Sequence, residues 1–363
     1  MMSSSEHEKW MGRCLHLAAL GATSAAPNPM VGAVLVLNGT ILAEGWHRKA
    51  GGPHAEVECL RAFGDGPVPE GATMYVNLEP CAHHGRTPPC AELLIQRNVR
   101  HVVIGQRDPF PLVAGKGIDL LQKNGVKVVE NVLANECRWL QRRFLTSVEQ
   151  GRPYVVLKWA RSADGYLDQH PRTSRTVQRI SSPTSDVIVH KWRTEEQAIL
   201  VGSRTVANDN PTLTVRHVEG RQPLRVVLDR KGITPEESKV FDKSTPTLLF
   251  TSAVRKGIEV EQVIVPPDAD PVTFVLNELH KRSIRSVLVE GGAEMLQHFI
   301  RSGIWDEARV INSAVKLARG TAAPVLGVEV ARTEQMREDR LDFYVNSSSP
   351  SLNGILPAAE WAW

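Results

Sequence analysis

The feature that most constrains the fold of this chain is the alternation of short apolar runs with segments of helical periodicity. In the first half, strand-like runs at residues 73–78 and 101–106 alternate with helical segments that begin at Ala55 and Cys90. A further helical segment at 117–125 and a run at 126–130 follow. Strands that alternate with helices favour a mainly parallel sheet with helices on its faces. The sequence therefore predicts an α/β fold.

An antiparallel hairpin is expected before this alternating part. Residues 9–20 carry apolar side chains at helical spacing, and apolar runs at 31–37 and 40–47 follow a loop. The two runs are joined by Asn38-Gly39. An Asn-Gly pair between two apolar runs is a strong hairpin signal, because both residues tolerate positive φ.

A domain boundary is expected near residue 150. A charged helical segment at 135–150 ends in Gly151-Arg152-Pro153, and a new strand begins directly afterwards. A chain of 363 residues is long for one domain and sufficient for two, so we expect domains at 1–150 and 151–363. The last ~18 residues are interpreted as a surface tail. The second half again alternates strands and helices, at 154–160, 185–197, 198–202, 224–229, 247–251, 274–282, 286–292, 293–303 and 307–315.

The composition excludes several classes of protein. The chain is 42% hydrophobic and 23% charged, as in ordinary globular proteins, and 43 basic against 40 acidic residues give a net charge of +3, without the excess typical of nucleic-acid binding. It contains no run of about 20 apolar residues and no signal-peptide pattern near its start. Five sparse cysteines argue against a disulfide framework. We therefore expect a cytoplasmic protein with no nucleic-acid or membrane partner.

Three residues have the chemistry of a catalytic zinc site. His54 lies in the segment PHAEVECL, and Cys81 and Cys90 lie in EPCAHHGRTPPC. One imidazole and two thiolates are a set that zinc accepts while its fourth position stays open for water. Prolines precede both His54 and Cys90, so both are expected at helix N-termini. The positive end of a helix dipole stabilises a thiolate there.

Glu56 indicates that this site is hydrolytic. A zinc site that only stabilises a fold has no use for a carboxylate that is not a ligand, whereas hydrolysis needs a group that accepts and returns a proton. His-x-Glu followed by Pro-Cys and a second Cys is the signature of zinc deaminases. Here eight residues separate the two cysteines, so the loop is longer than the usual two-residue spacing.

Two other interpretations stay open on local grounds. Cys81 and Cys90 could be buried free thiols, since cysteine is among the most buried residue types. Alternatively, His83 or His84 could complete a four-ligand structural zinc site. The remaining cysteines, Cys14, Cys59 and Cys137, are interpreted as core residues without a functional role.

The chain resembles a known family over about residues 8–330. The segments PNPMVGAVLV, GWHRKAGGPHAEVECL and LEPCAHHGRTPPCAELL resemble the deaminase half of the bifunctional riboflavin-biosynthesis deaminase/reductase. The segments VLKWARSADG, HKWRTEEQAILVGSRTVANDNPTLTVR and LVEGGAEM are similar to its reductase half. The resemblance implies a cytidine-deaminase-like three-layer α/β/α domain followed by a dihydrofolate-reductase-like α/β domain.

For the first domain, the resemblance implies Zn²⁺ on His54, Cys81 and Cys90, with Glu56 as the proton shuttle. The reaction would remove the 2-amino group of 2,5-diamino-6-(phosphoribosylamino)pyrimidin-4-one. By the same resemblance, the pyrimidine would contact Asn28 and His47, and its phosphate would contact Arg86, whose guanidinium suits a phosphate. Locally, Arg86 is equally well a solvated loop residue. The chain departs from the family where Phe110 follows Asp108-Pro109, since an Asn is usual at that position.

For the second domain, local signals are weak. There is no Gly-x-Gly-x-x-Gly, which excludes an ordinary Rossmann fingerprint, but paired glycines between a strand and a helix can admit a phosphate. The resemblance implies NADPH-dependent reduction of the ribosyl group to ribityl. On local evidence alone, Arg193 would be interpreted as a solvated helix residue and Asp209 as a turn former, and the resemblance reverses both interpretations. The implied cofactor residues are Lys158, Ala160, Asp164, Thr205, Asp209, Gly291 and Gly292, and the implied substrate residues are Arg193, Leu213, Arg216 and Glu290.

One departure bears on the second activity. The family usually has Trp where this chain has Arg179, so a protein that only deaminates, with a binding or dimerisation module as its second half, is the alternative. A nucleic-acid base deaminase is a further rival, but the loops of the site contain few aromatic residues for base stacking. A structural zinc protein is the third. The resemblance also implies a homo-oligomer, a dimer or a tetramer, that acts on small phosphoribosylated pyrimidines.

Overall fold

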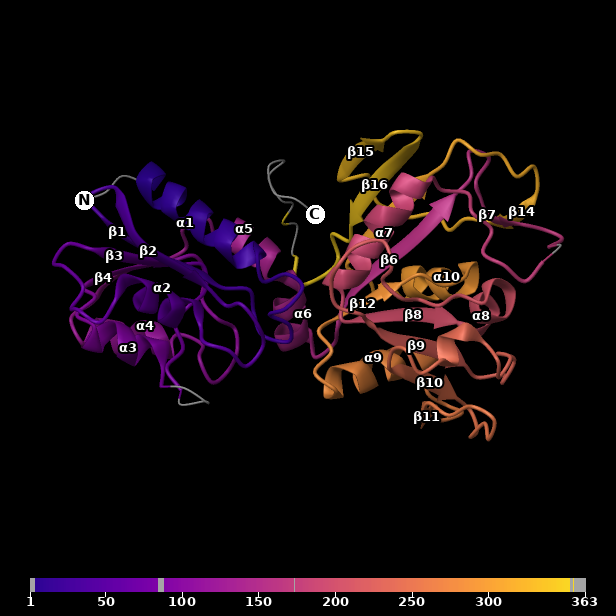
Figure 1. Ribbon diagram of the computed structural model, residues 1–363, viewed down its shortest axis with the longest axis horizontal. Helices are drawn as coiled ribbons and strands as arrows, with labels where there is room; N and C mark the ends of the chain where they lie inside the picture. The colour runs from indigo at the N-terminus through magenta and orange to yellow at the C-terminus, as the bar shows by residue number, and fades with distance from the viewer. Residues whose placement is uncertain (1–3, 84–87, 173, 353–354, 356–363) are drawn as a thin grey trace. The chain divides into compact units, whose positions relative to one another are not determined.

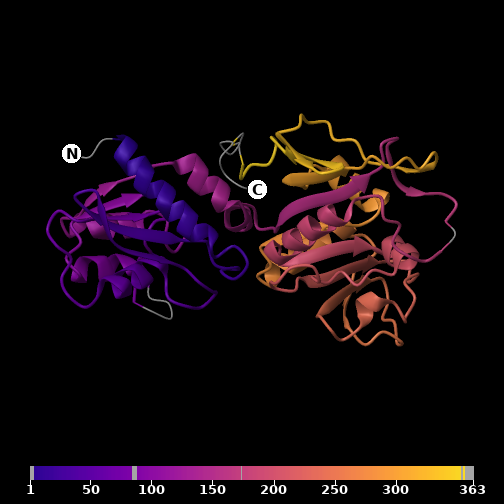
Figure 2. The same cartoon turned by 45° about the horizontal axis from the view of Figure 1, so that its top comes forward.

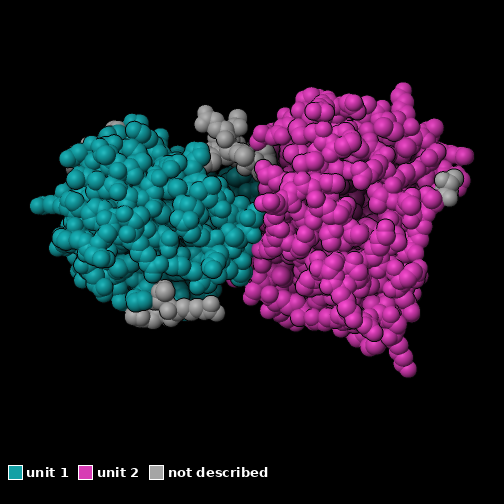
Figure 3. All heavy atoms as spheres, viewed as in Figure 1, with its two compact units in different colours: residues 1–150, 355–363 teal, residues 151–354 magenta. Residues whose placement is uncertain are grey.

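The computed structural model describes residues 4–83, 88–172, 174–352 and 355. Its contacts divide the chain into two compact units, one made mainly of residues up to Gln150 and one of Gly151–Gly354 (Figure 3). Among the helices of the described residues, none has both the length and the hydropathy needed to cross a membrane. Both units are α/β, as the alternating pattern predicted.

Unit 1 contains a five-stranded sheet of order β2-β1-β3-β4-β5. The expected hairpin is confirmed, because β1 pairs antiparallel with β2 down to Leu37 opposite Thr40. Asn38 and Gly39 both have positive φ, of 50° and 75°, as a tight hairpin turn requires. The remaining strands β3, β4 and β5 are parallel to one another. The bounds are β1 Gly32–Leu37, β2 Thr40–Trp46, β3 Thr73–Val76, β4 His101–Ile104 and β5 Lys127–Val129.

Helices cover both faces of this sheet and make three layers (Figure 1). One face packs against α1 and α5 through residues such as Met11 and Cys137. The opposite face packs against α2, α3 and α4 through residues such as Leu60, Leu94 and Leu121. The alternation of strand side chains between the two faces explains this sandwich, since neither face is left to water. The bounds are α1 Ser4–Ala19, α2 Ala55–Phe63, α3 Cys90–Gln96, α4 Lys116–Lys123 and α5 Ala134–Leu140.

The charged helix expected at 135–150 is two helices. Helix α5 ends at Leu140, and α6 (Arg142–Gln150) begins after the buried Gln141. The side-chain amide of Gln141 accepts a hydrogen bond from the backbone N–H of Met30 at 3.1 Å and donates one to the carbonyl of Met30. Gln141 therefore connects the end of unit 1 to the loop that precedes β1.

Unit 2 is built on a nine-stranded sheet of order β11-β10-β9-β8-β12-β6-β13-β16-β15. Neighbouring strands from β11 to β13 are parallel, and β16 and β15 extend the sheet as an antiparallel edge, yellow in Figure 2. A small two-stranded sheet, β14-β7, lies beside it. The bounds are β6 Tyr154–Arg161, β7 Tyr166–Gln169, β8 Ala198–Gly202, β9 Leu224–Asp229, β10 Thr247–Thr251, β11 Glu261–Ile264, β12 Ser286–Val289, β13 Glu307–Asn312, β14 Gly320–Ala322, β15 Arg332–Met336 and β16 Asp339–Val345.

Two hydrophobic clusters pack against the parallel part of this sheet. On one face, α9 and α10 contribute Leu276 and Phe299 to a cluster that includes Val226 of β9. On the other, Val206 of α8 and Leu213 pack against Val227 of β9. Adjacent residues of β9 thus point to opposite faces, so β9 is buried on both sides. The bounds are α7 Pro183–Glu195, α8 Ser203–Asp209, α9 Pro271–Lys281 and α10 Ala293–Ser302.

More of the C-terminal segment is packed into unit 2 than we expected. Ser349, Ser351 and Leu352 fall within the predicted surface tail, yet all three are buried. The hydroxyl of Ser349 donates a hydrogen bond of 2.5 Å to the carboxylate of Asp306. This contact satisfies a fully buried carboxylate, which explains why a polar segment lies against the core.

Candidate functional site

The three expected zinc ligands lie together in unit 1. His54 is the residue before α2, Cys90 is the first residue of α3, and Cys81 lies on the segment that follows β3. The Nδ1 atom of His54 is 3.3 Å from Sγ of Cys90 and 3.7 Å from Sγ of Cys81. The donor atoms of these three residues all lie within 4.8 Å of one another, and among the described residues they form the group that could hold a metal ion.

This donor set fits zinc. Tetrahedral zinc, with bonds of about 2.1 Å to nitrogen and 2.3 Å to sulfur, places those two atoms about 3.6 Å apart. The His54-to-cysteine distances of 3.3 and 3.7 Å bracket that value. Hydrogen bonding with Cys90 and His54 lowers the pKa of the Cys81 thiol, and the backbone N–H of Cys90 lies 3.3 Å from the Cys81 sulfur. A thiolate is the form of cysteine that zinc binds.

Glu56 lies in the first turn of α2, beside this cluster. The residue is 3% exposed, and burial raises the pKa of its carboxyl to about 7. A carboxyl with a pKa near neutrality can both accept and release a proton at physiological pH. The position of Glu56 therefore suits a proton shuttle rather than a solvated helix residue.

His47 and Asn28 are brought together next to the cluster. His47 lies directly after β2, and its ring packs edge-on against that of His54 with centroids 5.7 Å apart. Its Nδ1 atom donates to the carbonyl of Pro53 at 2.8 Å, which leaves Nε2 to accept from the side-chain amide of Asn28 at 3.1 Å. Burial lowers the pKa of His47, so the ring is neutral at pH 7. The two residues form one polar unit at the site.

Glu79 is a residue of this site that our sequence analysis missed. Its carboxylate accepts hydrogen bonds from the backbone N–H groups of Asp108, Gly115, Gly117 and Ile118, at 3.0–3.3 Å. It therefore fixes the loop between β4 and α4 against the segment that carries Cys81. The sequence signal was the acidic residue two positions before Cys81, but its partners are backbone groups, which no side-chain pattern reveals.

Gly117 makes a test of this packing possible. A Cβ atom at Gly117 would lie 1.9 Å from the carbonyl oxygen of Pro80, next to Cys81. We expect Gly117→Ala to displace this segment, destabilise unit 1 by about 1–3 kcal/mol and reduce bound zinc. Zinc content after dialysis and thermal unfolding measure both effects. Gly12→Ala is the matched control, because Gly12 is also helical and has no atom within 4 Å of its Cβ position.

The loop between the two cysteines is only partly described. Arg86, the expected phosphate contact, and His84 lie outside the described residues. His83 is described and does not belong to the group of donor atoms formed by the three ligands. Its ring lies 6.5 Å, centroid to centroid, from that of Phe110, the residue at which the chain departs from the expected Asn. Cys14, Cys59 and Cys137 are buried, as expected for core residues.

Unit 2 contains a large cavity at the carboxyl ends of its parallel strands. Its volume is about 1240 Å³, more than one small substrate fills. The ends of parallel strands are the usual ligand-binding edge of an open α/β sheet. Most of the reductase residues expected from the resemblance line it, namely Lys158, Ala160, Arg193, Thr205, Asp209, Leu213, Arg216, Glu290 and Gly292.

A buried ion pair forms the inner wall of this cavity. Arg193, on α7, donates from Nε and Nη2 to the two carboxylate oxygens of Glu290 at 2.7 and 2.8 Å. Its Nη1 donates to the carbonyl of Thr214 at 3.0 Å. The ammonium of Lys158 lies 3.8 Å from Glu290, whose side chain is 7% exposed. Arg193 and Glu290 thus form a bidentate pair, which is the stronger geometry for an arginine and a carboxylate.

This pair predicts how the stability of unit 2 depends on pH. Burial disfavours the charged Glu290 carboxylate, but Arg193 and Lys158 outweigh burial and lower its pKa from 4.5 to about 2. Stability from a lowered pKa is present above about pH 4.5 and is lost as the pH falls towards 2. We expect urea unfolding of unit 2 to show this loss between pH 4.5 and 2, and a Glu290→Gln variant to show a shallower dependence. Equal slopes in both proteins would contradict the assignment.

The segment from Asn210 to Arg216 contributes several residues to the lining of the cavity, among them the two expected substrate contacts Leu213 and Arg216. Arg216 donates from Nη1 to the hydroxyls of Thr212 and Thr214, and its backbone N–H donates to Nδ1 of His190 at 2.9 Å. Burial and the nearby Arg193 and Arg216 lower the pKa of His190 to about 3, so it is a neutral acceptor. His190 was not expected as a site residue, since nothing in a polar helix marks it.

Two expected cofactor residues do not line the cavity. The carboxylate of Asp164 accepts hydrogen bonds from the hydroxyl of Ser162 at 2.6 Å and the N–H of Ala318 at 2.7 Å, so it connects two loops. Gly291 lies two residues after β12 and close to the end of β8, since a Cβ atom there would be 2.7 Å from Cα of Val201. Both residues thus shape the chain around the cavity.

Asp209 and Arg179, both singled out in the sequence, form ion pairs. Asp209 pairs with Arg172 at 2.5 Å. Arg179, where the family usually has Trp, lines the cavity and pairs with Asp186 of α7 at 2.5 Å. Because its side chain is 60% exposed, Arg179 does not supply the apolar packing that an indole would give.

Comparison with known families separates the chain into the same two parts. The model of the cytidine and deoxycytidylate deaminase zinc-binding region matches residues 4–106, and that of the RibD C-terminal domain matches residues 153–326. The riboflavin biosynthesis protein RibD of Bacillus amyloliquefaciens is 38% identical over 88% of this chain and 87% of its own length. RibD of Escherichia coli is 37% identical over 83% of this chain and 86% of its own length.

Solved structures agree with these relatives. A diaminohydroxyphosphoribosylaminopyrimidine deaminase/5-amino-6-(5-phosphoribosylamino)uracil reductase from Thermotoga maritima superposes with a TM-score of 0.84 at 35% identity, covering 94% of this chain and 98% of that one. RibD of Acinetobacter baumannii superposes with a TM-score of 0.85 at 32% identity, covering 94% and 99%. The zinc-type cluster in one unit and the cavity in the other match both halves of such an enzyme. The chain therefore belongs to the RibD family of bifunctional riboflavin-biosynthesis enzymes, with a zinc-dependent deaminase domain and an NADPH-dependent reductase domain.

Proposed function

We propose that unit 1 removes the 2-amino group of 2,5-diamino-6-(5-phosphoribosylamino)pyrimidin-4(3H)-one and that unit 2 then reduces the ribosyl group of 5-amino-6-(5-phosphoribosylamino)uracil to ribityl. The observation that carries this proposal is the buried Glu56 beside the triangle of His54, Cys81 and Cys90. The reductase assignment is supported by the basic cavity of unit 2. In this proposal residues 1–150 form the deaminase domain and residues from 151 onwards the reductase domain.

In the deaminase step, His54, Cys81 and Cys90 hold Zn²⁺, which when bound supplies Lewis acidity that makes water a nucleophile near pH 7. Glu56 accepts the proton of the attacking water and returns it to the departing amine, so that ammonia leaves and a carbonyl remains. Neutral His47 keeps the side-chain amide of Asn28 oriented towards the pyrimidine edge. Arg86 binds the substrate phosphate.

In the reductase step, bound NADPH supplies a hydride. Lys158, Ala160, Thr205, Asp209 and Gly292, which line the cavity, would hold the cofactor. The pairing of Arg193 with Glu290 and with the carbonyl of Thr214 commits most of its donors, so Arg216 is the more available arginine for the substrate phosphate. Glu290 remains charged at neutral pH, and its carboxylate holds the guanidinium of Arg193 at the wall of the cavity.

An assay of the purified, zinc-loaded chain tests both halves separately. With the diaminopyrimidine substrate, release of ammonia is expected without NADPH. With the deaminated intermediate and NADPH, loss of nicotinamide absorbance is expected. Ammonia release without any NADPH oxidation would support the deaminase-only alternative, in which unit 2 binds or dimerises. No ammonia release from zinc-loaded protein would contradict the deaminase assignment.

The cellular setting follows from the same proposal. We propose a cytoplasmic homo-oligomer, a dimer or a tetramer, because sparse unpaired cysteines suit a reducing compartment and the resemblance implies self-association. Sedimentation of the purified protein distinguishes these states from a monomer. Salt-sensitive binding of RNA, by contrast, would favour a nucleic-acid base deaminase.

A further inference from the structure

Arg225 is a fully buried arginine beneath the substrate-facing segment of unit 2. It is the second residue of β9, and its side chain is 0% exposed. Because strand residues alternate between faces, Arg225 shares its face with Val227, which packs against Leu213. Arg225 does not line the cavity, so it touches neither cofactor nor substrate.

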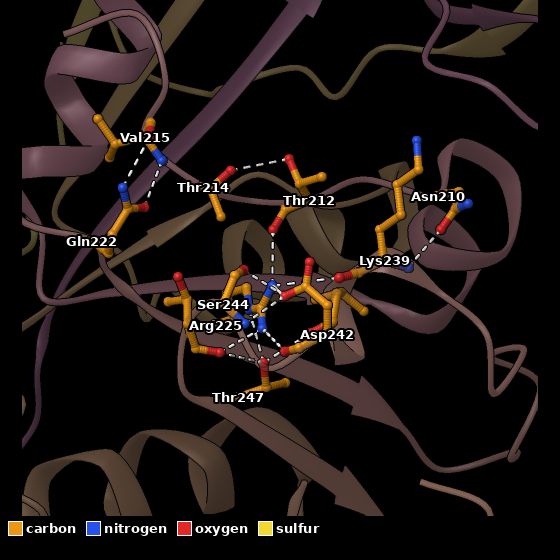
Figure 4. Close-up of polar contacts among 12 residues, drawn as sticks. Asn210, Thr212, Thr214, Val215, Gln222, Arg225, Lys239, Asp242, Ser244 and Thr247 are labelled. Atoms are coloured by element: carbon orange, nitrogen blue, oxygen red, sulfur yellow. Dashed lines mark hydrogen bonds and ion pairs between the residues drawn. The ribbon is translucent and has the colours of Figure 1, made fainter. Parts of the chain in front are cut away.

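The guanidinium of Arg225 connects three segments of the chain (Figure 4). Its Nε donates to the hydroxyl of Thr247 at 2.8 Å, and Nη1 donates to the carboxylate of Asp242 at 2.8 Å. Nη2 donates to the carbonyls of Asp242 and Thr245. Nη1 also lies 3.4 Å from the carbonyl oxygens of Thr212 and Lys239. Each nitrogen of the fork therefore has an acceptor.

A buried charge of this kind is costly unless it is fully hydrogen-bonded. Among the described residues, the carboxylate that pairs with Arg225 is that of Asp242, whose side chain is 46% exposed. Hydrogen bonds from Ser244 and the charge of Arg225 lower the pKa of Asp242, so the pair is ionised at neutral pH. Well-packed apolar residues usually give a core as much stability as a buried ion pair does. The specific gain from Arg225 lies in the geometry that its planar fork imposes on backbone carbonyls.

The loop around Thr212, which Arg225 contacts, contains residues in an unfavourable backbone conformation. Asn210 and Leu213 both have positive φ, of 44° and 54°, which residues other than glycine seldom adopt. The Asn210 side chain accepts a hydrogen bond from the N–H of Lys239 at 2.9 Å, and Lys239 in turn begins the short helix Lys239–Phe241 next to Arg225. Strained residues persist where surrounding contacts fix them. Arg225 and this helix provide those contacts.

We infer that Arg225 is a positioning residue of the reductase site: through Thr212 and the 239–247 segment it fixes the loop that presents Leu213 and Arg216 to the substrate. This inference rests on the proposed reductase function. The hydroxyl of Thr212 accepts from Arg216, and its carbonyl faces Arg225, so one residue joins the buried fork to the substrate arginine. Movement of the loop would therefore displace Arg216.

The test is Arg225→Lys in the full chain, since lysine keeps the charge but loses the fork. Calorimetric titration with 5-amino-6-(5-phosphoribosylamino)uracil, without NADPH, is expected to give a dissociation constant about tenfold higher, which corresponds to about 1.4 kcal/mol. In turnover, KM for this substrate should rise by a similar factor, and kcat and the dissociation constant of NADPH should change less than about threefold. Deamination by unit 1 should be unchanged.

Arg152→Lys is the matched control, because Arg152 is a largely buried arginine of the same unit whose fork donates to Asp306. It precedes β6, at the end of the strand opposite to the cavity. This variant should lower the melting temperature without changing substrate affinity. If Arg225→Lys does not fold, Asp242→Asn replaces it as the test. In that variant the dissociation constant of the substrate is expected to rise about threefold. Wild-type substrate affinity in the folded variant, or an equal rise of the dissociation constant in Arg152→Lys, would overturn the inference. Absence of NADPH oxidation by the wild-type chain would instead overturn the proposed function, while the binding measurements would still test Arg225.

Discussion

Glu56→Gln is expected to lower kcat for deamination by about 10³-fold while the protein retains its zinc. Glutamine has nearly the shape of glutamate, so the buried position beside the cluster stays filled, but it can neither accept the proton of water nor deliver one to the amine. Ammonia release measures the deaminase activity, and atomic emission spectroscopy measures the zinc content. Reduction by unit 2 of the same chain provides an internal check of folding.

Glu58→Gln is the matched control for this prediction. Glu58 lies two residues further along α2 and pairs with Arg48 and Arg61, whose side chains are exposed. Such surface pairs contribute little, so both zinc content and deamination should stay close to wild type. If Glu56→Gln still deaminates at a wild-type rate, Glu56 is not the proton shuttle. Loss of zinc in this variant would instead assign Glu56 to maintaining the metal site.

Glu290→Gln is expected to have the largest effect on unit 2. The change removes the negative partner of Arg193 and Lys158, and two cations are then left together in a buried wall of the cavity. Breaking a buried pair in this way costs about 3–5 kcal/mol. A cost of about 3 kcal/mol at the site also corresponds to a loss of about 10²-fold in reductase kcat/KM. Urea unfolding and NADPH oxidation measure the two effects.

Glu278→Gln serves as its control. Glu278 pairs with Lys281 on α9, and the lysine side chain is 70% exposed. Removing such a pair should change stability by less than about 1 kcal/mol and leave reduction unaffected. Equal stability of the Glu290 and Glu278 variants would show that the Arg193–Glu290 pair contributes nothing specific to unit 2.

The sequence predicted the parts of this protein that depend on local patterns. The turn at Asn38-Gly39 and the helix starts after Pro53 and at Cys90 need only neighbouring residues, and all three occur in the structure. The α/β class followed from the alternation of strands and helices. The zinc cluster also followed, because its ligand types are rare and each lies beside a recognisable strand or helix end.

The sequence did not reveal contacts whose partners are distant or are backbone groups. Glu79 accepts from N–H groups up to 39 positions away, and Arg225 donates largely to carbonyls. Asp164 was expected near the cofactor from the resemblance, yet its carboxylate is used by Ala318, 154 positions along the chain. Strands β15 and β16 were missed because their charged and polar residues conceal the alternation typical of a strand.

The connection between Gln141 and Met30 bears on how short a working deaminase could be made. The family model of the zinc-binding region ends at residue 106, before α4, α5 and α6. The buried amide of Gln141 nevertheless satisfies both backbone groups of Met30, two residues after Asn28. A fragment cut at residue 106 would lose both contacts from Gln141, while the hydrogen bond from the side-chain amide of Asn77 to the carbonyl of Met30 would remain. We therefore expect an autonomous deaminase domain to extend past Gln141, because helices beyond the zinc motif hold the loop that carries Asn28.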